Sequence, residues 1–292
     1  MPAEKYSAKK ETAVLINSAW NAENRIHLNR QNKALPKKIE KKQRSCTLRT
    51  KKKKQENKRQ YRKYIDNLKE GVIIKFGSYP FESDGTEKPI EWEILEKNED
   101  GTAIILSSKG IDTKPYNTEK EDITWAECSL RRWLNDEFYS KAFTAKEKDA
   151  IVEVSLKNKD NIGEVTQELV DFFNKHEIDL SPYKGQKWHT RGGEYTTDKV
   201  WLLSLEDMKR YGRRFSMDTS RIAMPTPYAK ERGVYTAADY GGSCWWWLRS
   251  PGDLQYSAAF VHYYGDVNSL GYYVSYSYGA VRVALKINLN NL

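Results

Sequence analysis

The sequence has little cysteine, and this shortage excludes several classes of protein. Only three cysteines, Cys46, Cys128 and Cys244, occur among 292 residues. An odd number at wide spacing predicts no disulfide framework, and the lack of a C-x-x-C pair predicts no zinc site. We therefore expect reduced thiols and no bound metal.

Long apolar runs are also missing. No stretch approaches the roughly 18 to 20 apolar residues that span a bilayer. The start, MPAEK at residues 1–5, lacks the apolar segment of a secretory signal. These absences predict a cytoplasmic protein without a membrane span, and they leave display on a cell or virion surface open.

Catalytic motifs are scarce as well. His176 and His189 lie in a weakly patterned stretch, and His262 lies in a tyrosine-rich one. No nucleophile motif accompanies any of these histidines. We therefore expect neither enzymatic activity nor a cofactor.

Positive charge is abundant, but only in the first quarter of the chain. Residues 1–70 hold 21 of the 49 basic residues and 7 of the 40 acidic ones, so their net charge is +14 and that of residues 71–292 is −5. This asymmetry predicts a basic N-terminal arm at 1–70 and a folded domain at 71–292.

The arm has high helix propensity but few apolar residues after position 36, so we expect it to be helical or disordered. A short amphipathic helix is predicted at 11–32. Three functions stay open for the arm: a solubilising segment, a nucleic-acid contact through phosphates, or a partner-docking helix. The tentative nucleic-acid residues are Lys51, Lys52, Lys53, Lys54, Lys58, Arg59, Arg62 and Lys63.

Apolar periodicity predicts both strands and helices in residues 71–292. Strands are predicted at 72–76, 90–95, 102–107 and 200–204. A Thr-x-x-Glu capping box at Thr124 predicts a helix that runs through Phe138, and two more helices are expected at 165–175 and 205–211. Residues 154–197 are polar and weakly patterned, so we interpret them as an insertion. The mixture predicts an α+β domain.

Six sequence blocks occur in an order that points to one family. They are FGSYP at 76–80, IEWEIL at 90–95, TW at 124–125 with CSLRRWLN at 128–135, VWLLS at 200–204, WWLRSPG at 246–252 and GAVRVAL at 279–285. In this order the blocks resemble a bacterial family of C-type-lectin-like fold that is distantly related to the formylglycine-generating enzymes. The resemblance covers roughly residues 71–289, and WWLRSPG is its most specific element.

The resemblance also implies a source of variation. Members of this family are frequent targets of diversity-generating retroelements, whose reverse transcriptase changes adenines while copying a template into the end of the gene. AAC and AAT codons altered in this way reach Tyr, Ser, Asp, His and Phe, but not Lys, Glu, Gln, Trp or Met. None of those five types occurs between Tyr256 and Val281, whereas seven tyrosines do. We place a candidate variable region at 253–281.

The composition of this region predicts a ligand-binding surface on physical grounds too. Tyrosine gives a large amphipathic contact area with few torsions to freeze, and serine adds adaptable hydrogen bonds, as in antibody paratopes. The predicted ligand-binding residues lie between small framework residues such as Ala258 and Gly271. They are Tyr256, Ser257, Phe260, His262, Tyr263, Tyr264, Asp266, Asn268, Ser269, Leu270, Tyr272, Tyr273, Ser275, Tyr276, Ser277 and Tyr278. The expected partner is a macromolecule, most simply a protein surface.

Several alternatives are weighed against this surface. The tyrosines could belong to an ordinary β-meander that buries half of them, since aromatic residues favour strands. The formylglycine-generating enzymes need a pair of reactive cysteines near the C-terminus, where this chain has only Cys244. Calcium-dependent lectins use Glu-Pro-Asn or Gln-Pro-Asp with Trp-Asn-Asp, and none of these motifs occurs. The remaining alternative is a nucleic-acid-binding protein that acts through its arm and carries a lectin-like domain of fixed specificity.

The blocks that flank the tyrosine-rich region are interpreted as scaffold. Trp245, Trp246, Trp247 and Leu248 are predicted to be core residues. Arg249 and Arg282 are predicted to be buried or half-buried partners of carboxylates.

Overall fold

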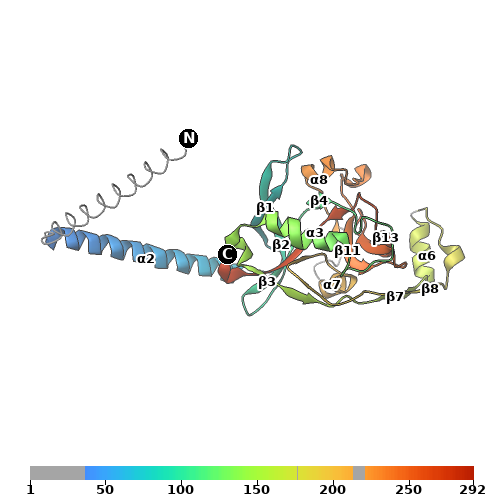
Figure 1. Cartoon of the computed structure of the whole chain (residues 1–292), viewed down its shortest axis with the longest axis horizontal. Coiled ribbons are helices and arrows are strands. Elements are labelled where there is room, and N and C mark those ends of the chain that lie inside the picture. Colours follow the sequence, from blue (N-terminus) through green and yellow to red (C-terminus); the bar gives the residue numbers. More distant parts are fainter. Residues whose placement is uncertain (1–36, 176, 213–220) are drawn as a thin grey trace, which may run out of the picture. The chain divides into compact units, whose positions relative to one another are not determined.

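The computed structural model describes residues 37–175, 177–212 and 221–292. The chain divides into two compact units, residues 1–66 and 67–292 (Figure 1). The amphipathic helix predicted at 11–32 lies outside the described residues.

The described part of the first unit is helical. Helix α2 (Lys37–Asn67) is 31 residues long and contains most of the basic residues of the predicted arm. Every side chain at positions 52–64 is exposed. Between the two predicted states of the arm, the structure therefore shows the helical one for this segment.

One antiparallel sheet of the second unit is built mainly from the first part of the domain and its last strand. The strand order is β1 (Ile73–Pro80), β2 (Glu87–Lys97), β3 (Thr102–Ser107), β15 (Ala284–Asn288) and β10 (Val200–Trp201), with β5 (Ile151–Val152) also paired to β15. The strands predicted at 72–76, 90–95 and 102–107 are confirmed as β1, β2 and β3. The strand predicted at 200–204 is shorter than expected.

The second sheet contains the tyrosine-rich region. Its order is β13 (Val267–Tyr273), β12 (Ser257–Val261), β11 (Trp246–Pro251), β14 (Ala280–Val281) and β4 (Asp112–Thr113). Strands β11 and β14 pair in parallel, and the other neighbours pair antiparallel. Only Arg282 and Val283 separate β14 from β15, so the chain passes directly from this sheet to the first one.

Short helices occupy several connections. They are α3 (Ser129–Trp133), the π-turn η1 (Leu134–Phe138), α4 (Tyr139–Ala142), α5 (Ala145–Lys148), α7 (Leu205–Arg210) and α8 (Pro227–Glu231), with 3-10 turns η2 (Ser181–Tyr183), η4 (Ala238–Tyr240) and η5 (Leu289–Asn291). The helix predicted from Thr124 begins instead at Ser129. Its N-cap is Cys128, whose sulfur accepts from the Arg131 amide, while the Thr124 hydroxyl donates to the Glu127 carboxylate.

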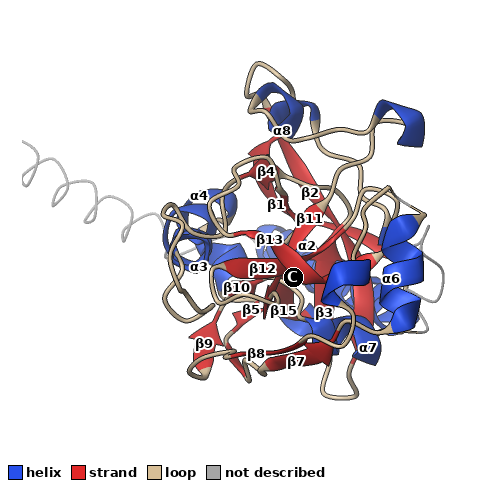
Figure 2. Cartoon of the chain, turned by 90° about the vertical axis from the view of Figure 1, so that its right-hand side faces the viewer, coloured by secondary structure: helices blue, strands red, loops and turns tan. Residues whose placement is uncertain are grey.

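Residues 154–197 are more regular than their weak pattern suggested. Strand β6 (Val154–Leu156) pairs with β9 (Thr196–Asp198), and β7 (Asn161–Glu164) pairs with β8 (Lys187–Thr190). Between β7 and β8 lies α6 (Gln167–Asn174), which confirms the helix predicted at 165–175. Figure 1 shows α6 beside β7 and β8 at one end of the domain, and Figure 2 shows the strands and helices from that end.

The core between these elements is rich in tryptophan. The side chains of Trp92, Trp125, Trp246 and Trp247 are all less than 2% exposed. The predicted core residues Trp245 and Leu248 are buried as well. The domain is therefore α+β, with the WWLRSPG block at the centre of its second sheet.

Candidate ligand-binding surface

Residues 256–278 form a β-hairpin followed by a loop. Strands β12 and β13 pair in antiparallel fashion, and the connecting turn is closed by hydrogen bonds between the main chains of His262 and Asp266 and of Gly265 and His262. Gly265 has φ +100°, a conformation that favours glycine, and the turn carries Tyr263 and Tyr264 at its tip. Residues 274–279 have no strand structure.

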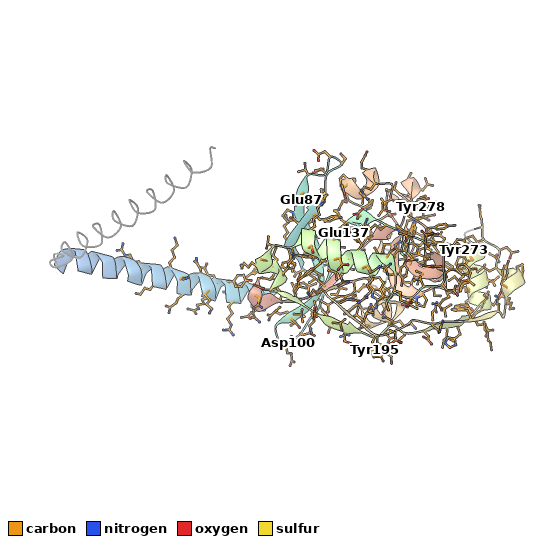
Figure 3. All side chains as sticks on the ribbon, in the orientation of Figure 1. Glu87, Asp100, Glu137, Tyr195, Tyr273 and Tyr278 are labelled. Atoms are coloured by element: carbon orange, nitrogen blue, oxygen red, sulfur yellow. The ribbon has the colours of Figure 1, made fainter. Side chains whose placement is uncertain are left out.

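The seven tyrosines of this segment differ in exposure. Tyr273 and Tyr278 are 37% and 51% exposed and lie near each other (Figure 3). The other five, at positions 256, 263, 264, 272 and 276, are half-buried. None of the seven is completely buried, and the interspersed framework residues Ala258, Ala259, Val261 and Val274 are fully buried.

Two predicted ligand-binding residues are buried, which corrects their assignment. Phe260 is 0% exposed because it stacks on Tyr272 at 4.2 Å and meets Trp245 edge-on. Ser257 is 4% exposed, and its hydroxyl donates a hydrogen bond to the Leu254 carbonyl. Both residues belong to β12, which is buried on both faces.

The remaining predicted residues are half-buried or exposed. This holds for His262, Asp266, Asn268, Ser269, Leu270 and Ser275, which are half-buried, and for Ser277, which is exposed. The structure therefore brings fourteen of the sixteen predicted residues to the surface of one hairpin and its following loop.

The tyrosine rings meet in two series, which, among the described residues, are connected only through the rings of His262 and Phe260. Tyr272 meets Tyr276 at 5.7 Å, and Tyr276 meets both Tyr273 and Tyr278 within 6 Å. At the hairpin turn, Tyr263 and Tyr264 meet each other at 5.1 Å. Such ring pairs hold each other in place while one edge of each stays accessible.

Two further tyrosines extend the ring series at the hairpin turn, and neither was predicted as a binding residue. Tyr240 meets Tyr263 at 5.1 Å and Tyr235 meets it at 5.7 Å, and both are about 45% exposed. They lie outside the compositional window that marked residues 256–281, so only the fold brings them there. We call the nine residues Tyr235, Tyr240, Tyr256, Tyr263, Tyr264, Tyr272, Tyr273, Tyr276 and Tyr278 the tyrosine face.

One lysine is also part of this surface. The Lys120 ammonium lies 3.6 Å from the centre of the Tyr273 ring and 5.2 Å from that of Tyr256. A cation over an aromatic face orders both partners. Nothing in the sequence around Lys120 indicated this contact.

Burial changes the acidity of groups at this surface. Burial, followed by the nearby Asp266 carboxylate, raises the pKa of the Tyr264 hydroxyl. Burial also raises the pKa of Tyr272 and of Asp253. The Tyr264 and Tyr272 hydroxyls are therefore protonated near neutral pH and can both donate and accept hydrogen bonds.

The main chain of the segment is held by side chains from other parts of the domain. The Thr113 hydroxyl donates to the Ser277 carbonyl (2.6 Å), the Ser243 hydroxyl to that of Tyr263 (2.8 Å), and the Asn161 amide to that of Ser269 (2.8 Å). Arg221 Nε donates to the Gly265 carbonyl. We call Thr113, Asn161, Arg221 and Ser243 the anchor residues; none was predicted as a binding residue.

A pocket of about 330 Å³ borders the hairpin. One wall consists of Leu169, Phe172 and Phe173 from α6, and the opposite wall consists of residues from the turn and β13, including Val267 and Leu270. Arg221 and Asp266 add charged groups to its lining. The pocket is large enough for one bulky side chain of a partner.

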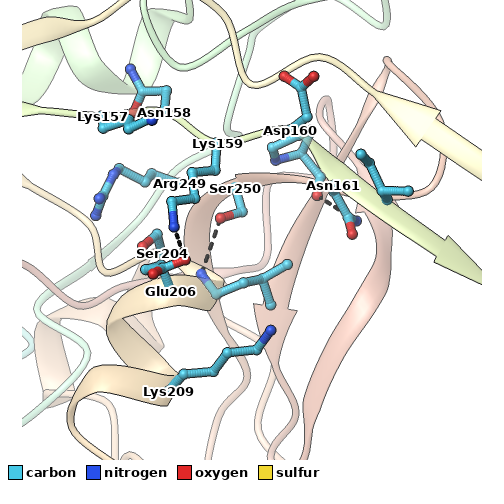
Figure 4. A pocket seen from close by; sticks show the side chains of 13 residues that line it. Lys157, Asn158, Lys159, Asp160, Asn161, Ser204, Glu206, Lys209, Arg249 and Ser250 are labelled. Carbon is cyan, nitrogen blue, oxygen red and sulfur yellow. Dashed lines mark hydrogen bonds and ion pairs between the residues drawn. The ribbon is translucent and has the colours of Figure 1, made fainter.

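A second pocket, of about 120 Å³, is lined by residues 157–162, by the start of α7 and by the end of β11 (Figure 4). Its lining is mainly polar and charged. Lys159 and Glu206 form an ion pair across it at 2.7 Å, and Arg249 forms one with Asp207. The prediction that Arg249 partners a carboxylate is confirmed. Arg282 donates to the Ser107 carbonyl and lies over the Trp246 ring, so it too has a buried structural position.

Histidine, cysteine and carboxylate side chains are the candidate metal ligands and nucleophiles among the described residues. Among them, no group of three or more His, Cys, Asp or Glu residues is arranged to hold a metal ion. Cys128 and Cys244 are buried, and burial raises the pKa of both thiols to about 12. A thiol of such high pKa is a poor nucleophile near neutral pH.

The tentative nucleic-acid residues all lie in α2. Lys52, Lys53, Lys54, Lys58, Arg59, Arg62 and Lys63 have exposed side chains, whereas the side chain of Lys51 lies outside the described set. Within the described residues, no helix has the length and apolar character needed to cross a membrane.

Comparison with known proteins gives one match. Residues 100–289 match the family described as a domain of unknown function, DUF6273. This range includes the second sheet, the hairpin and every anchor residue. Neither the curated proteins nor the solved structures contain a significant match.

Proposed function

The chain belongs to the family of the domain of unknown function DUF6273, and we propose that its tyrosine face is a ligand-binding surface displayed on a C-type-lectin-like scaffold. The ligand is a macromolecule, most simply a protein. Variation of the surface by a diversity-generating retroelement is part of the same proposal.

The observation that carries the proposal is how the hairpin is supported. The four anchor residues donate to carbonyl oxygens at Tyr263, Gly265, Ser269 and Ser277. A carbonyl acceptor is present whatever the side chain at that position. The main chain thus keeps these supports when the side chains at its surface change, which is what a variable binding surface requires.

The chemistry of the face favours a macromolecular ligand. Nine tyrosines and Lys120 form a broad aromatic area, and exposed aromatic surface of this kind marks an interaction site. The pocket beside α6 can hold one protruding side chain of the partner. Hot-spot residues at the centre of protein interfaces fill pockets in this way. A small sugar or a metal ion would use only a fraction of this area.

The scaffold part of the proposal rests on the sequence blocks. FGSYP and IEWEIL form parts of β1 and β2, WWLRSPG forms β11, and GAVRVAL runs through β14 into β15. Each of these four blocks therefore forms part of a sheet, as the framework of a lectin-like domain would. The absence of Lys, Glu, Gln, Trp and Met at 256–281 supports diversification through adenine changes.

A pair of display libraries tests the binding surface. The first randomises Tyr263, Tyr264, Tyr273, Tyr276 and Tyr278 in the full chain, and the control library randomises the buried residues Ala258, Ala259, Phe260, Val261 and Val274. We expect most clones of the first library and few of the control to fold, as judged by protease resistance on the display particle. We also expect selection on immobilised hen-egg lysozyme, used as an arbitrary protein target, to enrich binders from the first library only.

Each part of the proposal can fail separately. If both libraries lose folded clones equally, the tyrosines are core residues and the surface claim is wrong. If the first library folds but yields no binders to lysozyme or to a second unrelated protein, the face does not recognise protein. Retroelement diversification requires a near-copy of the 253–281 coding segment, differing at adenines, beside a reverse-transcriptase gene; a genome without one refutes that part.

A further inference from the structure

Helix α2 presents its basic residues in an arrangement that the tyrosine face does not explain. At 3.6 residues per turn, Lys52, Lys58, Arg59, Arg62 and Lys63 fall within an arc of about 140°. We call these five residues the basic face. All five side chains are exposed. The face extends for about 17 Å along the helix axis, since each residue adds about 1.5 Å.

Like charges on this face lie close together in the helix. Lys58 and Arg62 are four residues apart, as are Arg59 and Lys63, and such like-charge pairs destabilise an isolated helix. Glu56 is the one acidic residue between positions 52 and 63, whereas the same stretch holds seven basic residues. A surface that repels itself in this way is stabilised when a polyanion covers it.

We infer that the basic face binds the phosphate backbone of a nucleic acid. Five cations in about 17 Å match a polymer with closely and regularly spaced negative charges. The face consists only of cations, and the contact inferred is with phosphates, which carry no sequence information. This site is separate from the tyrosine face, and either could exist without the other.

The helix fits other partners less well. A helix that lies on a lipid surface needs a broad apolar face opposite its cations, and residues 49–64 supply only Tyr61 and Tyr64. A coiled coil with a second copy needs apolar residues every three to four positions, and the same stretch lacks them. The charge and the lack of apolar surface therefore favour nucleic acid.

The test measures binding of the full chain to a labelled 30-base-pair DNA and a 30-nucleotide RNA of mixed sequence, by fluorescence anisotropy between 50 and 200 mM NaCl. Five phosphate contacts predict that affinity for duplex DNA falls about 500-fold over this range. The variant K52Q/K58Q/R59Q/R62Q/K63Q should lose at least 100-fold in affinity at 50 mM NaCl. Circular dichroism of both proteins checks that the helix is retained.

Two matched controls separate this face from bulk charge. The variant K75Q/K141Q/K146Q/K184Q/K187Q removes five exposed lysines from residues 67–292 and should change affinity less than threefold. Within α2, R59Q/R62Q removes two charges from the basic face and should weaken binding at least fivefold more than K53Q/K54Q, which removes two from outside it.

Four results would overturn the inference, and three of them come from binding measurements on the proteins and controls above. They are no binding to either nucleic acid at 50 mM NaCl, equal losses for R59Q/R62Q and K53Q/K54Q, and binding that survives in the five-residue α2 variant with the helix intact. The fourth is binding to vesicles containing 30% phosphatidylserine without binding to nucleic acid.

Discussion

Strands β11 and β13 belong to the same sheet and are separated only by β12, yet they are built in opposite ways. All six residues of β11 are buried, whereas none of the seven residues of β13 is. In β11 the side chains make the specific contacts: Trp246 Nε1 donates to the Arg221 carbonyl and Trp247 Nε1 to that of Lys114, each at 3.0 Å.

In β13 the main chain makes the specific contacts. It pairs with β12, and the Asn161 amide supports the Ser269 carbonyl. Gly271, with φ +85°, packs so closely on β12 that a Cβ atom would lie 2.6 Å from the Ala258 carbonyl oxygen. Side-chain identity thus determines the fold at β11, while main-chain position determines it at β13. Four substitutions test this difference.

The largest effect is expected for Trp247→Ala. This side chain is fully buried and packs edge-on against Trp245 and Tyr116. Its loss leaves a cavity, so the free energy of unfolding should fall by about 3–5 kcal/mol in urea titration. Trp188→Ala, at a half-exposed tryptophan of β8, is the control and should cost clearly less. Equal losses would mean that β11 has no special place in the core.

The next effect is expected for Arg249→Ala, also in β11. The Arg249 side chain is 6% exposed and forms an ion pair with Asp207. In the alanine variant the Asp207 carboxylate would keep a negative charge that is poorly compensated. We expect a loss of about 2–3 kcal/mol in the free energy of unfolding, somewhat below the cost of breaking a fully buried pair. The double variant R249M/D207N should be more stable than R249A. If it is less stable, the unpaired carboxylate is not the source of the loss.

A smaller effect is expected for Asn161→Ala, which removes support from the β13 main chain. The Asn161 amide reaches the carbonyls of Pro251, Gly252 and Ser269 within 3.0 Å. Leaving such buried carbonyls without a donor should cost about 1–3 kcal/mol. Hydrogen exchange should become faster at residues 267–273 and stay unchanged at residues 246–249 of β11. Unchanged exchange at 267–273 would contradict the anchoring role.

The smallest effect is expected for Tyr273→Ser combined with Tyr278→Ser. Both rings are exposed, so the free energy of unfolding should change by no more than about 0.5 kcal/mol. Tyr272→Ser is the contrast, because that ring stacks on Phe260 and meets Trp245, and it should cost at least about 1 kcal/mol. A double variant as unstable as Tyr272→Ser would place the whole tyrosine face in the core.

The sequence predicted elements whose pattern is local. A short apolar segment, an alternating segment and its hairpin partner located β1, β2 and β3, and a helix was predicted where α6 lies. Trp245, Trp246 and Trp247, at the start of the WWLRSPG block and just before it, were predicted as core and are buried. The start of α3 was missed because a Cys N-cap carries no standard signal, whereas the Thr124 pattern satisfied the capping rule without a helix.

The binding surface was predicted by composition, and its errors have physical causes. Phe260 and Ser257 belong to β12, which is covered on both faces, so alternation cannot separate exposed from buried positions there. Tyr235, Tyr240 and Lys120 reach the face through long-range folding. The anchor residues were invisible for the same reason, since each lies far along the chain from the carbonyl that it supports.

The ring series of the tyrosine face has an optical consequence. Tyr272 lies 5.2 Å from Trp245 and 5.7 Å from Tyr276, so light absorbed by the surface tyrosines can pass as excitation energy to a buried indole. The fluorescence emission of Trp245 then depends in part on the surroundings of the solvent-exposed tyrosine rings. Any molecule that covers those rings should alter this emission, and the protein carries its own fluorescent reporter without a label.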